Sequence, residues 1–169
     1  MKFKIDQVPG FYQGYVEQVK EHDLIAALQT SGKAFVEMCE VLTELQSLYR
    51  YAEGKWSIKD MIQHLVDSER VFGYRAMRFA RNDKTELSGF EQDDYVEAVF
   101  ADKFGLQELI SSFKHLRQST TDLFDSLSES ELERSGVSNG AVMSVEMIGF
   151  IIAGHTLHHQ RVIEQKYLK

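Results

Sequence analysis

Apolar residues recur along most of the chain at the three- and four-residue spacing of an α-helix, and few windows alternate apolar and polar side chains as a half-buried strand would. The only proline, Pro9, lies near the start and leaves the rest of the chain free to form long helices. The pattern predicts one short helix and then four long ones: Phe11–Val19, Asp23–Leu45, Ile58–Arg81, Leu106–Leu127 and a last helix from Ser144 to Tyr167. We therefore predict an all-α protein, a four-helix bundle with short extra helices, formed by residues 1–169 as a single domain.

Capping signals support several of these helix ends. In "SIKD" the Ser57 hydroxyl can accept from the Asp60 amide while the Asp60 carboxylate returns the bond, so a helix is expected to begin at Ile58. "SESE" offers Ser128 and Glu131 as a second box for a short helical turn. Ser144 is expected to cap the last long helix.

Other stretches interrupt the helices. Ser31 and Gly32 weaken the middle of the second helix, so a bend or a looser turn is expected there. A long acidic connection follows Arg81; its length suits a crossover along the bundle, with a short helix near "DDYVEAVF". "RSGVSNGAVM" is expected to be a loop.

Composition narrows the functional classes. Hydrophobic residues make up 43% of the chain and charged residues 27%, which is typical of a globular protein. Nineteen lysines and arginines against 26 aspartates and glutamates give a net charge of −7, which opposes nucleic-acid binding. The amino terminus lacks the apolar run of a signal peptide, and no stretch is long enough to span a bilayer, so we expect a cytoplasmic protein without a membrane partner. A buried, inert Cys39 is the expected role of the lone cysteine.

Candidate chemistry gathers in "GHTLHHQRVIEQ", which holds three of the six histidines. On a helical wheel centred on His155, His159 falls about 40° away, inside the apolar stripe, and His158 falls about 60° to the other side, on its shoulder. The stripe itself is formed by Ile148, Ile151, Ile152, Val162 and Ile163. The spacing of four residues lets His155 and His159 bind one divalent ion. Two core histidines whose ring nitrogens are hydrogen-bonded to other groups would show the same spacing, and this is the alternative. One ion would satisfy nitrogens that otherwise cost roughly 1–3 kcal/mol each when buried.

A third ligand is sought on another helix. His64, in "MIQHLVDSER", falls on a shoulder of its own apolar arc that it shares with Ser68 and Arg75, so it can face a cavity in the bundle. His22 and His115 have no histidine partner at ligand spacing and are interpreted as ordinary surface or half-buried residues.

Two segments, "GKWSIKDMIQHLVDSERVFGYRAMRFARNDKT" and "FIIAGHTLHHQRVIEQKYL", together with the helix spacing, resemble the DinB/YfiT-like superfamily of metal-binding four-helix bundles over nearly the whole chain. The resemblance implies that His64, His155 and His159 are the protein ligands of a divalent ion, commonly zinc or nickel, with solvent completing the shell. His158 recurs in the family pattern as a neighbour and is not the usual ligand.

The family resemblance also implies a homodimer, since members are often dimers. Phe150, Leu157 and Leu168 lie opposite the histidine stripe and form a second apolar stripe. This stripe is interpreted as a dimer face or as a contact for the short extra helices, and we favour the dimer face.

Three histidines with an open coordination position are typical of a catalytic metal site. Relatives include thiol-dependent transferases or isomerases and proteins labelled only as metal-dependent hydrolases. We expect a metal-dependent transferase that activates a low-molecular-weight thiol towards a small electrophile, in detoxification or stress response. The alternatives are a hydrolase that uses metal-bound hydroxide and a non-catalytic, metal-stabilised stress-response module.

Arg75 is the candidate cofactor-binding residue, for a carboxylate of the thiol or of its substrate. An ion pair with an acidic residue of a neighbouring helix is the more common role of a buried arginine and is the alternative. Asp67 and Glu69 are acid–base candidates by residue type only, and for Glu69 a buried bridge to an arginine is favoured.

Overall fold

A computed structural model describes residues 1–168; Lys169, the last residue of the predicted domain, lies outside the described residues. Helices account for most of the chain, and the short elements lie between the long ones. In chain order the helices and strands are α1 (Gly10–Val16), α2 (Leu24–Glu40), α3 (Glu44–Ser47), α4 (Ile58–Ala80), α5 (Gln92–Val99), α6 (Leu106–Asp125), α7 (Glu129–Leu132), β1 (Ser135–Ser138), β2 (Ala141–Ser144) and α8 (Val145–Lys166), with single 3₁₀ turns at Ile5–Gln7 and Ala101–Lys103. The predicted all-α four-helix architecture is confirmed.

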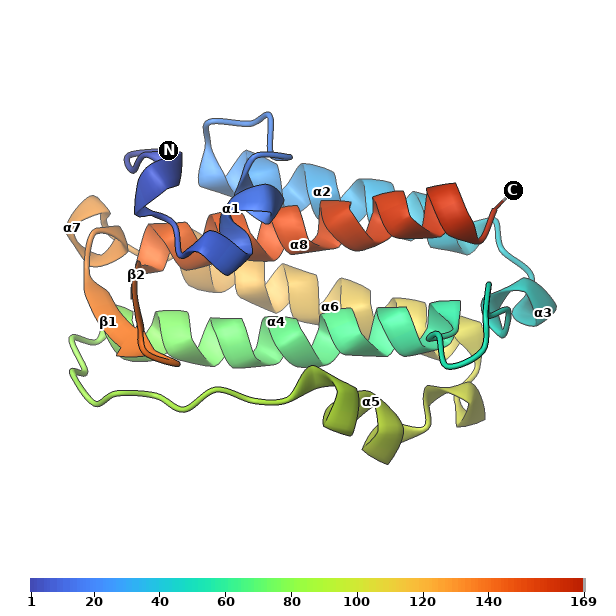
Figure 1. Ribbon diagram of the computed structural model, residues 1–169. Helices are drawn as coiled ribbons and strands as arrows, with labels where there is room; N and C mark the ends of the chain where they lie inside the picture. Colours follow the sequence, from blue (N-terminus) through green and yellow to red (C-terminus); the bar gives the residue numbers. More distant parts are fainter. Residues whose placement is uncertain (169) are drawn as a thin grey trace.

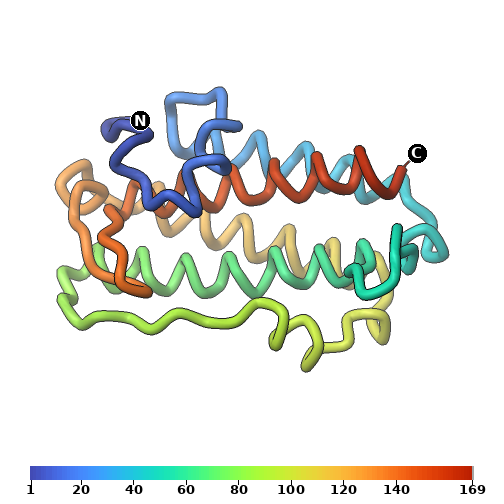
Figure 2. The backbone as a smooth tube through the Cα atoms, in the orientation of Figure 1, coloured from blue at the N-terminus to red at the C-terminus, as the bar shows by residue number. Residues whose placement is uncertain are grey.

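The four long helices pack as a closed ring in which α2 contacts α8, α8 contacts α4, α4 contacts α6 and α6 contacts α2. Figure 1 shows that α4 and α6 run in the same direction, because the segment between them returns along the length of the bundle. The tube in Figure 2 traces this return beside α4, as the predicted crossover requires. None of the helices in residues 1–168 combines the length and apolarity needed to cross a bilayer.

The apolar core is divided into two clusters by a polar layer. One cluster includes Phe72, Phe124 and Ile148, and the other includes Phe35, Leu65, Phe113 and Ile163. Along every long helix the residues between the two clusters are buried and polar: Ser31 on α2, His64, Ser68 and Glu69 on α4, Arg117, Thr120 and Thr121 on α6, and His155, Thr156 and His159 on α8. The middle of the bundle is therefore where buried chemistry is concentrated.

The capping predictions are confirmed. Ser57 accepts from the Asp60 amide and the Asp60 carboxylate accepts from the Ser57 amide at the start of α4. The Glu131 carboxylate likewise accepts from the Ser128 amide before α7. Ser144 caps α8 by accepting from the Met147 amide.

The second helix differs from its prediction. It ends at Glu40 and not near Leu45, since Thr43 caps the separate short helix α3. Helix α2 continues without interruption through Ser31 and Gly32, so the looser turn is absent: the Ser31 hydroxyl donates back to the Ala27 carbonyl, and the missing side chain of Gly32 admits the Arg117 side chain. The first helix is also shorter than predicted and ends at Val16.

The predicted loop "RSGVSNGAVM" is instead a β-hairpin. Strands β1 and β2 pair antiparallel, with Ser138 opposite Ala141 at the tip. The two turn residues, Asn139 and Gly140, have φ values of 51° and 71°, the left-handed conformation that a tight two-residue hairpin turn requires. Leu87, on the crossover, pairs with Ser138 and ties the hairpin to that segment. The hairpin tip is thereby held beside α4.

Candidate metal centre

Three histidine side chains meet in the polar layer between α4 and α8. His64 Nε2 lies 3.1 Å from His155 Nε2, and His159 Nε2 lies 3.0 Å from His155 Nε2. All three rings are buried, and their ligand atoms lie within 4.8 Å of one another. In residues 1–168 no carboxylate or thiol joins this cluster. The residues named from the sequence as ligands are therefore brought together.

The three imidazoles are held in the neutral form. Burial lowers the pKa of His64 to about 4, and the nearby His158 adds a smaller electrostatic effect in the same direction. Burial also lowers the pKa values of His155 and His159 well below their ordinary value of 6.5. A neutral imidazole is the form that binds a metal ion, so no proton has to be displaced from these rings at neutral pH.

The donor set fits one divalent ion. His155 Nε2 lies about 3 Å from each of the other two Nε2 atoms, so the three rings can share an ion at the usual metal–nitrogen distance of about 2.0–2.1 Å. Without an ion, His155 Nε2 can donate to only one of its two neighbours, and His159 Nδ1 is buried without a hydrogen-bond partner among the described residues. Ser68 Oγ lies 3.4 Å from His64 Nδ1, where it can fix the tautomer that leaves Nε2 free.

Helix α1 covers one side of the centre. The Tyr15 ring centroid lies 5.1 Å from that of His155 and 5.0 Å from that of His158. This approach depends on Gly154, because a Cβ atom there would lie only 2.2 Å from the Tyr15 carbonyl oxygen. Burial raises the pKa of Tyr15, so its phenol is protonated at neutral pH.

Trp56, the only tryptophan, covers another side. Its ring lies 4.8 Å from the His64 ring and 6.4 Å from the His159 ring, centroid to centroid. The Tyr167 hydroxyl donates to the Trp56 carbonyl at 2.8 Å. Trp56 is thus held against two of the three candidate ligands.

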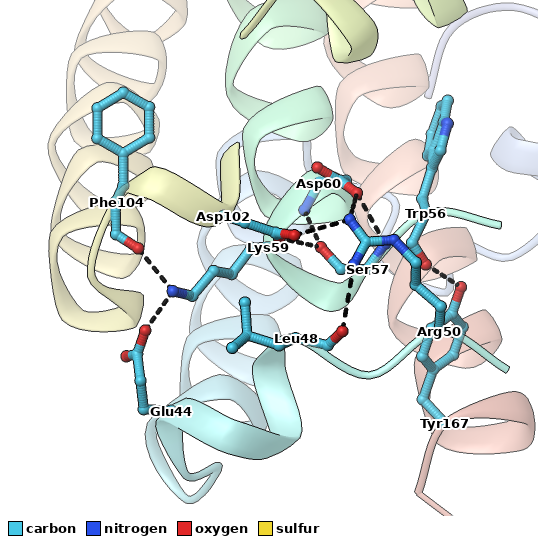
Figure 3. Close-up of polar contacts among 10 residues, drawn as sticks. All are labelled: Glu44, Leu48, Arg50, Trp56, Ser57, Lys59, Asp60, Asp102, Phe104 and Tyr167. Atoms are coloured by element: carbon cyan, nitrogen blue, oxygen red, sulfur yellow. Dashed lines mark hydrogen bonds and ion pairs between the residues drawn. The ribbon is translucent and has the colours of Figure 1, made fainter. Parts of the chain in front are cut away.

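A polar network at the start of α4 anchors the segment that carries Trp56 (Figure 3). Arg50 donates to Asp60 at 3.0 Å and to Asp102 at 2.9 Å, and so joins the segment before Trp56 to α4 and to the turn before α6. The buried Lys59 ammonium donates to the Phe104 carbonyl at 2.6 Å. The network ties three segments, far apart in sequence, around the residue that covers the centre.

The acid–base candidates are engaged elsewhere. Glu69 is buried and forms an ion pair with Arg117, whose Nη2 lies 2.8 Å from Glu69 Oε2. The favoured bridge from Glu69 to an arginine is therefore confirmed. Asp67 points towards the helix surface, where it accepts from Gln63 and Arg70. Neither carboxylate is a free base at the centre.

Arg75 does not form the ion pair that we gave as the common alternative. Its guanidinium is buried and donates to the Ser88 carbonyl at 2.9 Å, and it has no salt bridge to any residue from 1 to 168. It lies over the rings of Phe72 and Phe90, 5.5 and 5.8 Å from their centroids. Glu69, a buried carboxylate on the same helix, is paired with Arg117 instead.

The structure also places the other three histidines and the second apolar stripe of the last helix. His158 is half-buried at the edge of the cluster, as its place on the wheel predicts, while His22 and His115 are exposed. Phe150 is fully buried against Phe3 of the N-terminal segment, so this part of the second apolar stripe is not available as a dimer face. The homodimer itself stays a prediction.

Two cavities reach the centre from outside. One, of about 410 Å³, is lined by His155 together with Tyr15, Ser68 and Phe72. The other, of about 460 Å³, is lined by His159 together with Trp56. Both are large enough for a small molecule. Sequence reasoning did not identify Tyr15 or Trp56, whose positions depend on packing between distant segments; the proximity of Trp56 to the "SIKD" cap was the only local signal.

Comparison with known proteins identifies the relatives of this fold. The family model described as "DinB superfamily" matches residues 27–163. A curated protein of Halalkalibacterium halodurans named "Putative metal-dependent hydrolase" is 23% identical over 157 residues, covering 90% of this chain and 91% of its own length. A protein of the same name from Geobacillus thermodenitrificans is 23% identical over 155 residues, covering 90% of this chain and 85% of its own.

Solved structures share the architecture. YfiT from Bacillus subtilis, described as "a probable metal-dependent hydrolase with an unusual four-helix bundle topology", superposes with a TM-score of 0.69 at 17% identity, over 84% of this chain and 85% of its own. A mycothiol-dependent maleylpyruvate isomerase superposes with a TM-score of 0.68 at 9% identity, over 93% of this chain and 61% of its own. At these identities the likeness concerns the fold alone.

Proposed function

Since the chain belongs to the DinB superfamily, we propose that it is a metal-dependent enzyme whose His64, His155 and His159 hold one divalent cation, zinc or nickel, and that it transfers a low-molecular-weight thiol to a small electrophile. The observation that carries the proposal is the convergence of three buried, neutral Nε2 atoms between α4 and α8. A cation held there would supply the Lewis acidity that converts a bound thiol to its thiolate at neutral pH.

The charge of the donor set favours an anionic ligand. Three neutral imidazoles leave the two positive charges of the cation uncompensated, and no described carboxylate lies in the cluster. A thiolate compensates part of this charge, and imidazole sites suit zinc and nickel. The aromatic rings of Tyr15 and Trp56 cover two sides of the histidine cluster, and a lower local dielectric there would strengthen that attraction.

The engagement of the buried carboxylates near His64 in other contacts supports a thiol over water as the nucleophile. Hydrolysis by a metal enzyme commonly needs a general base beside the nucleophile. Of the buried carboxylates near His64 in sequence, Glu69 has both of its oxygens bonded to Arg117, and Asp60 accepts from Arg50 and from the Ser57 amide. A thiol has an ordinary pKa of about 8.5 and needs much less help than water to ionise.

A hydrolase is the second candidate, because the two curated relatives are named as metal-dependent hydrolases. In that case the same three histidines hold the cation, and the half-exposed cavity beside His155 admits an ester or amide. The two candidates share the metal centre and differ in the molecule that attacks the substrate.

Metal binding is tested first, with a readout that needs no substrate. Trp56 lies 4.8 Å from the His64 ring, so binding of a paramagnetic ion such as Ni²⁺ to metal-free protein should quench its fluorescence and saturate at one equivalent. His64→Ala and His159→Ala should each weaken binding by at least about 100-fold, since loss of an outer-shell partner alone costs about 10–100-fold. His115→Ala, an exposed histidine, is the control. Retained stoichiometric metal in both ligand variants contradicts the proposal.

Activity then separates transferase from hydrolase. Metal-loaded protein is supplied with glutathione, cysteine or mercaptoethanol and with chlorodinitrobenzene: transfer forms a carbon–sulfur bond, chloride leaves with its electron pair and the thiol proton passes to solvent. Parallel reactions with nitrophenyl acetate measure hydrolysis. Thiol consumption that requires the metal and His159 supports the transferase, whereas metal-dependent ester cleavage without thiol consumption supports the hydrolase.

A further inference from the structure

The cavity beside His155 extends away from the histidine cluster towards the hairpin. Its walls come from α1, α4, α8, the crossover after Ser88 and the hairpin tip, and its volume is about 410 Å³. His155 of the histidine cluster, Phe90 of the crossover and Ser138 of the hairpin all line it. A ligand of this cavity can therefore contact the candidate metal centre and the hairpin tip together.

One face of α4 runs along this cavity. His64, Ser68, Phe72 and Arg75 follow one another at intervals of four, four and three residues, which places them on one side of the helix. At 1.5 Å per residue, the eleven residues from His64 to Arg75 span about 16 Å along the axis. Between the two ends stand Ser68 and Phe72, both of which line the cavity. The face thus begins at a candidate metal ligand and ends at a buried cation.

Arg75 is a cation without a counter-charge. Its side chain is 2% exposed and has no ion pair within residues 1–168. The guanidinium lies over the rings of Phe72 and Phe90, which line the cavity, while Arg75 itself lies behind these rings and is not among the lining residues. Burial without a counter-charge is unfavourable for a guanidinium, and its planar fork of donors matches a carboxylate.

Ser138 supplies a second donor at the same end. It is 1% exposed, and its Oγ has no hydrogen-bond partner among the described residues although it lies in the cavity wall. The pairing of Leu87 with Ser138 and the left-handed turn at Asn139 fix its position. Glu91 is the one carboxylate that lines the cavity, and its side chain is exposed to solvent at the rim.

We propose that Arg75 and Ser138 Oγ form an anion subsite, and that the molecule bound in this cavity carries a carboxylate several bonds away from the atom that meets the histidine cluster. The metal-binding end of this molecule rests on the proposed function, whereas the anion subsite rests on Arg75 and Ser138 alone. The subsite selects carboxylate-bearing thiols or electrophiles over neutral ones of the same length.

The subsite is tested first without metal. Binding of hexanoate and of hexanol to metal-free protein is compared by saturation-transfer NMR, with fluorescence of Trp56 as a second reporter. Hexanoate should bind at least about tenfold more tightly than hexanol, as expected for a charged hydrogen-bonded pair. Equal binding of the two probes overturns the subsite whatever the metal does.

Variants of Arg75 and Ser138 test whether these two residues cause the preference for hexanoate. Arg75→Gln should abolish the preference for hexanoate, Arg75→Lys should keep part of it, and Ser138→Ala should reduce it while leaving the fold intact, as circular dichroism can check. Arg70→Gln removes an exposed arginine from the same helix and is the matched control. A preference that survives in both Arg75→Gln and Ser138→Ala overturns the proposal.

Binding of thiols to the metal-loaded protein tests the metal centre and the anion subsite together. Mercaptohexanoate should bind at least about tenfold more tightly than mercaptohexanol, and the difference should vanish in Arg75→Gln. If metal-free protein prefers hexanoate but neither thiol binds to the metal-loaded protein, the result supports the anion subsite and contradicts the proposed thiol chemistry. If both thiols bind equally to the metal-loaded protein, the result supports thiol binding at the metal centre and overturns the anion subsite.

Discussion

Substitution of Gly154 by alanine tests how α1 is held against the metal centre. A Cβ atom at this position would lie 2.2 Å from the Tyr15 carbonyl oxygen, 2.5 Å from the Tyr15 carbonyl carbon and 3.1 Å from the Val16 amide nitrogen. All of these are backbone atoms, so the contact cannot be relieved by rotating a side chain. Helix α1 must move away from α8, and the Tyr15 ring must move with it from His155.

The expected cost is about 2–4 kcal/mol of the free energy of unfolding. Forcing one extra carbon into a packed interface costs typically 1–3 kcal/mol. Displacing α1 also exposes part of Val16, which is 1% exposed and whose full burial is worth about 1.5–3 kcal/mol. The higher helix propensity of alanine offsets about 0.5–1 kcal/mol of this loss of stability.

Urea unfolding followed by circular dichroism measures this cost, and Gly73→Ala is the control. Gly73 lies inside α4 with no atom within 4 Å of its added Cβ, so this variant should gain about 0.5–1 kcal/mol from helix propensity. Amide exchange should accelerate in residues 10–16 of the Gly154→Ala variant only. The reasoning is refuted if Gly154→Ala is as stable as Gly73→Ala.

Two further predictions concern buried groups. Glu69→Gln should lower the free energy of unfolding by about 3–5 kcal/mol, because it leaves the buried Arg117 without its counter-charge; a loss below about 1 kcal/mol in urea unfolding would count against this. Burial raises the pKa of Cys39 to about 12, so a disulfide reagent at pH 8 should react only after unfolding. Since the unfolded thiol ionises near pH 8.5 and the folded one does not, Cys39 should also make stability fall as pH rises from about 8.5 towards 12, and Cys39→Ala should remove that part of the slope.

Features set by local periodicity could be predicted from the sequence. The wheel placed His155 and His159 on the buried face of α8, because helical spacing alone determines which residues share a face. Capping at Ser57 and Ser144 is equally local. The β-hairpin had a local signal too, since Asn139-Gly140 favours a two-residue turn, but the short strands around it lack the apolar alternation that would have indicated them.

Features that depend on packing between distant segments could not be predicted in this way. The wheel of α4 put His64 on a shoulder without saying which helix it faces; its meeting with α8 was implied by the family resemblance. A buried partner for Glu69 was foreseen as an arginine, yet Arg117 lies 48 residues away and was not identified. Tyr15 reaches the cluster only because Gly154 lets two backbones approach, a relation that neither segment reveals alone.

The position of α1 in the chain has a consequence for engineering. The family match covers residues 27–163 and contains all three histidines, whereas Tyr12 and Tyr15, which line the cavity, belong to the helix before it. The three candidate metal ligands and part of the wall of the cavity beside them are therefore encoded in separable stretches. Exchange of residues 10–16 offers a route to a different cavity lining in which all three candidate metal ligands are left in place.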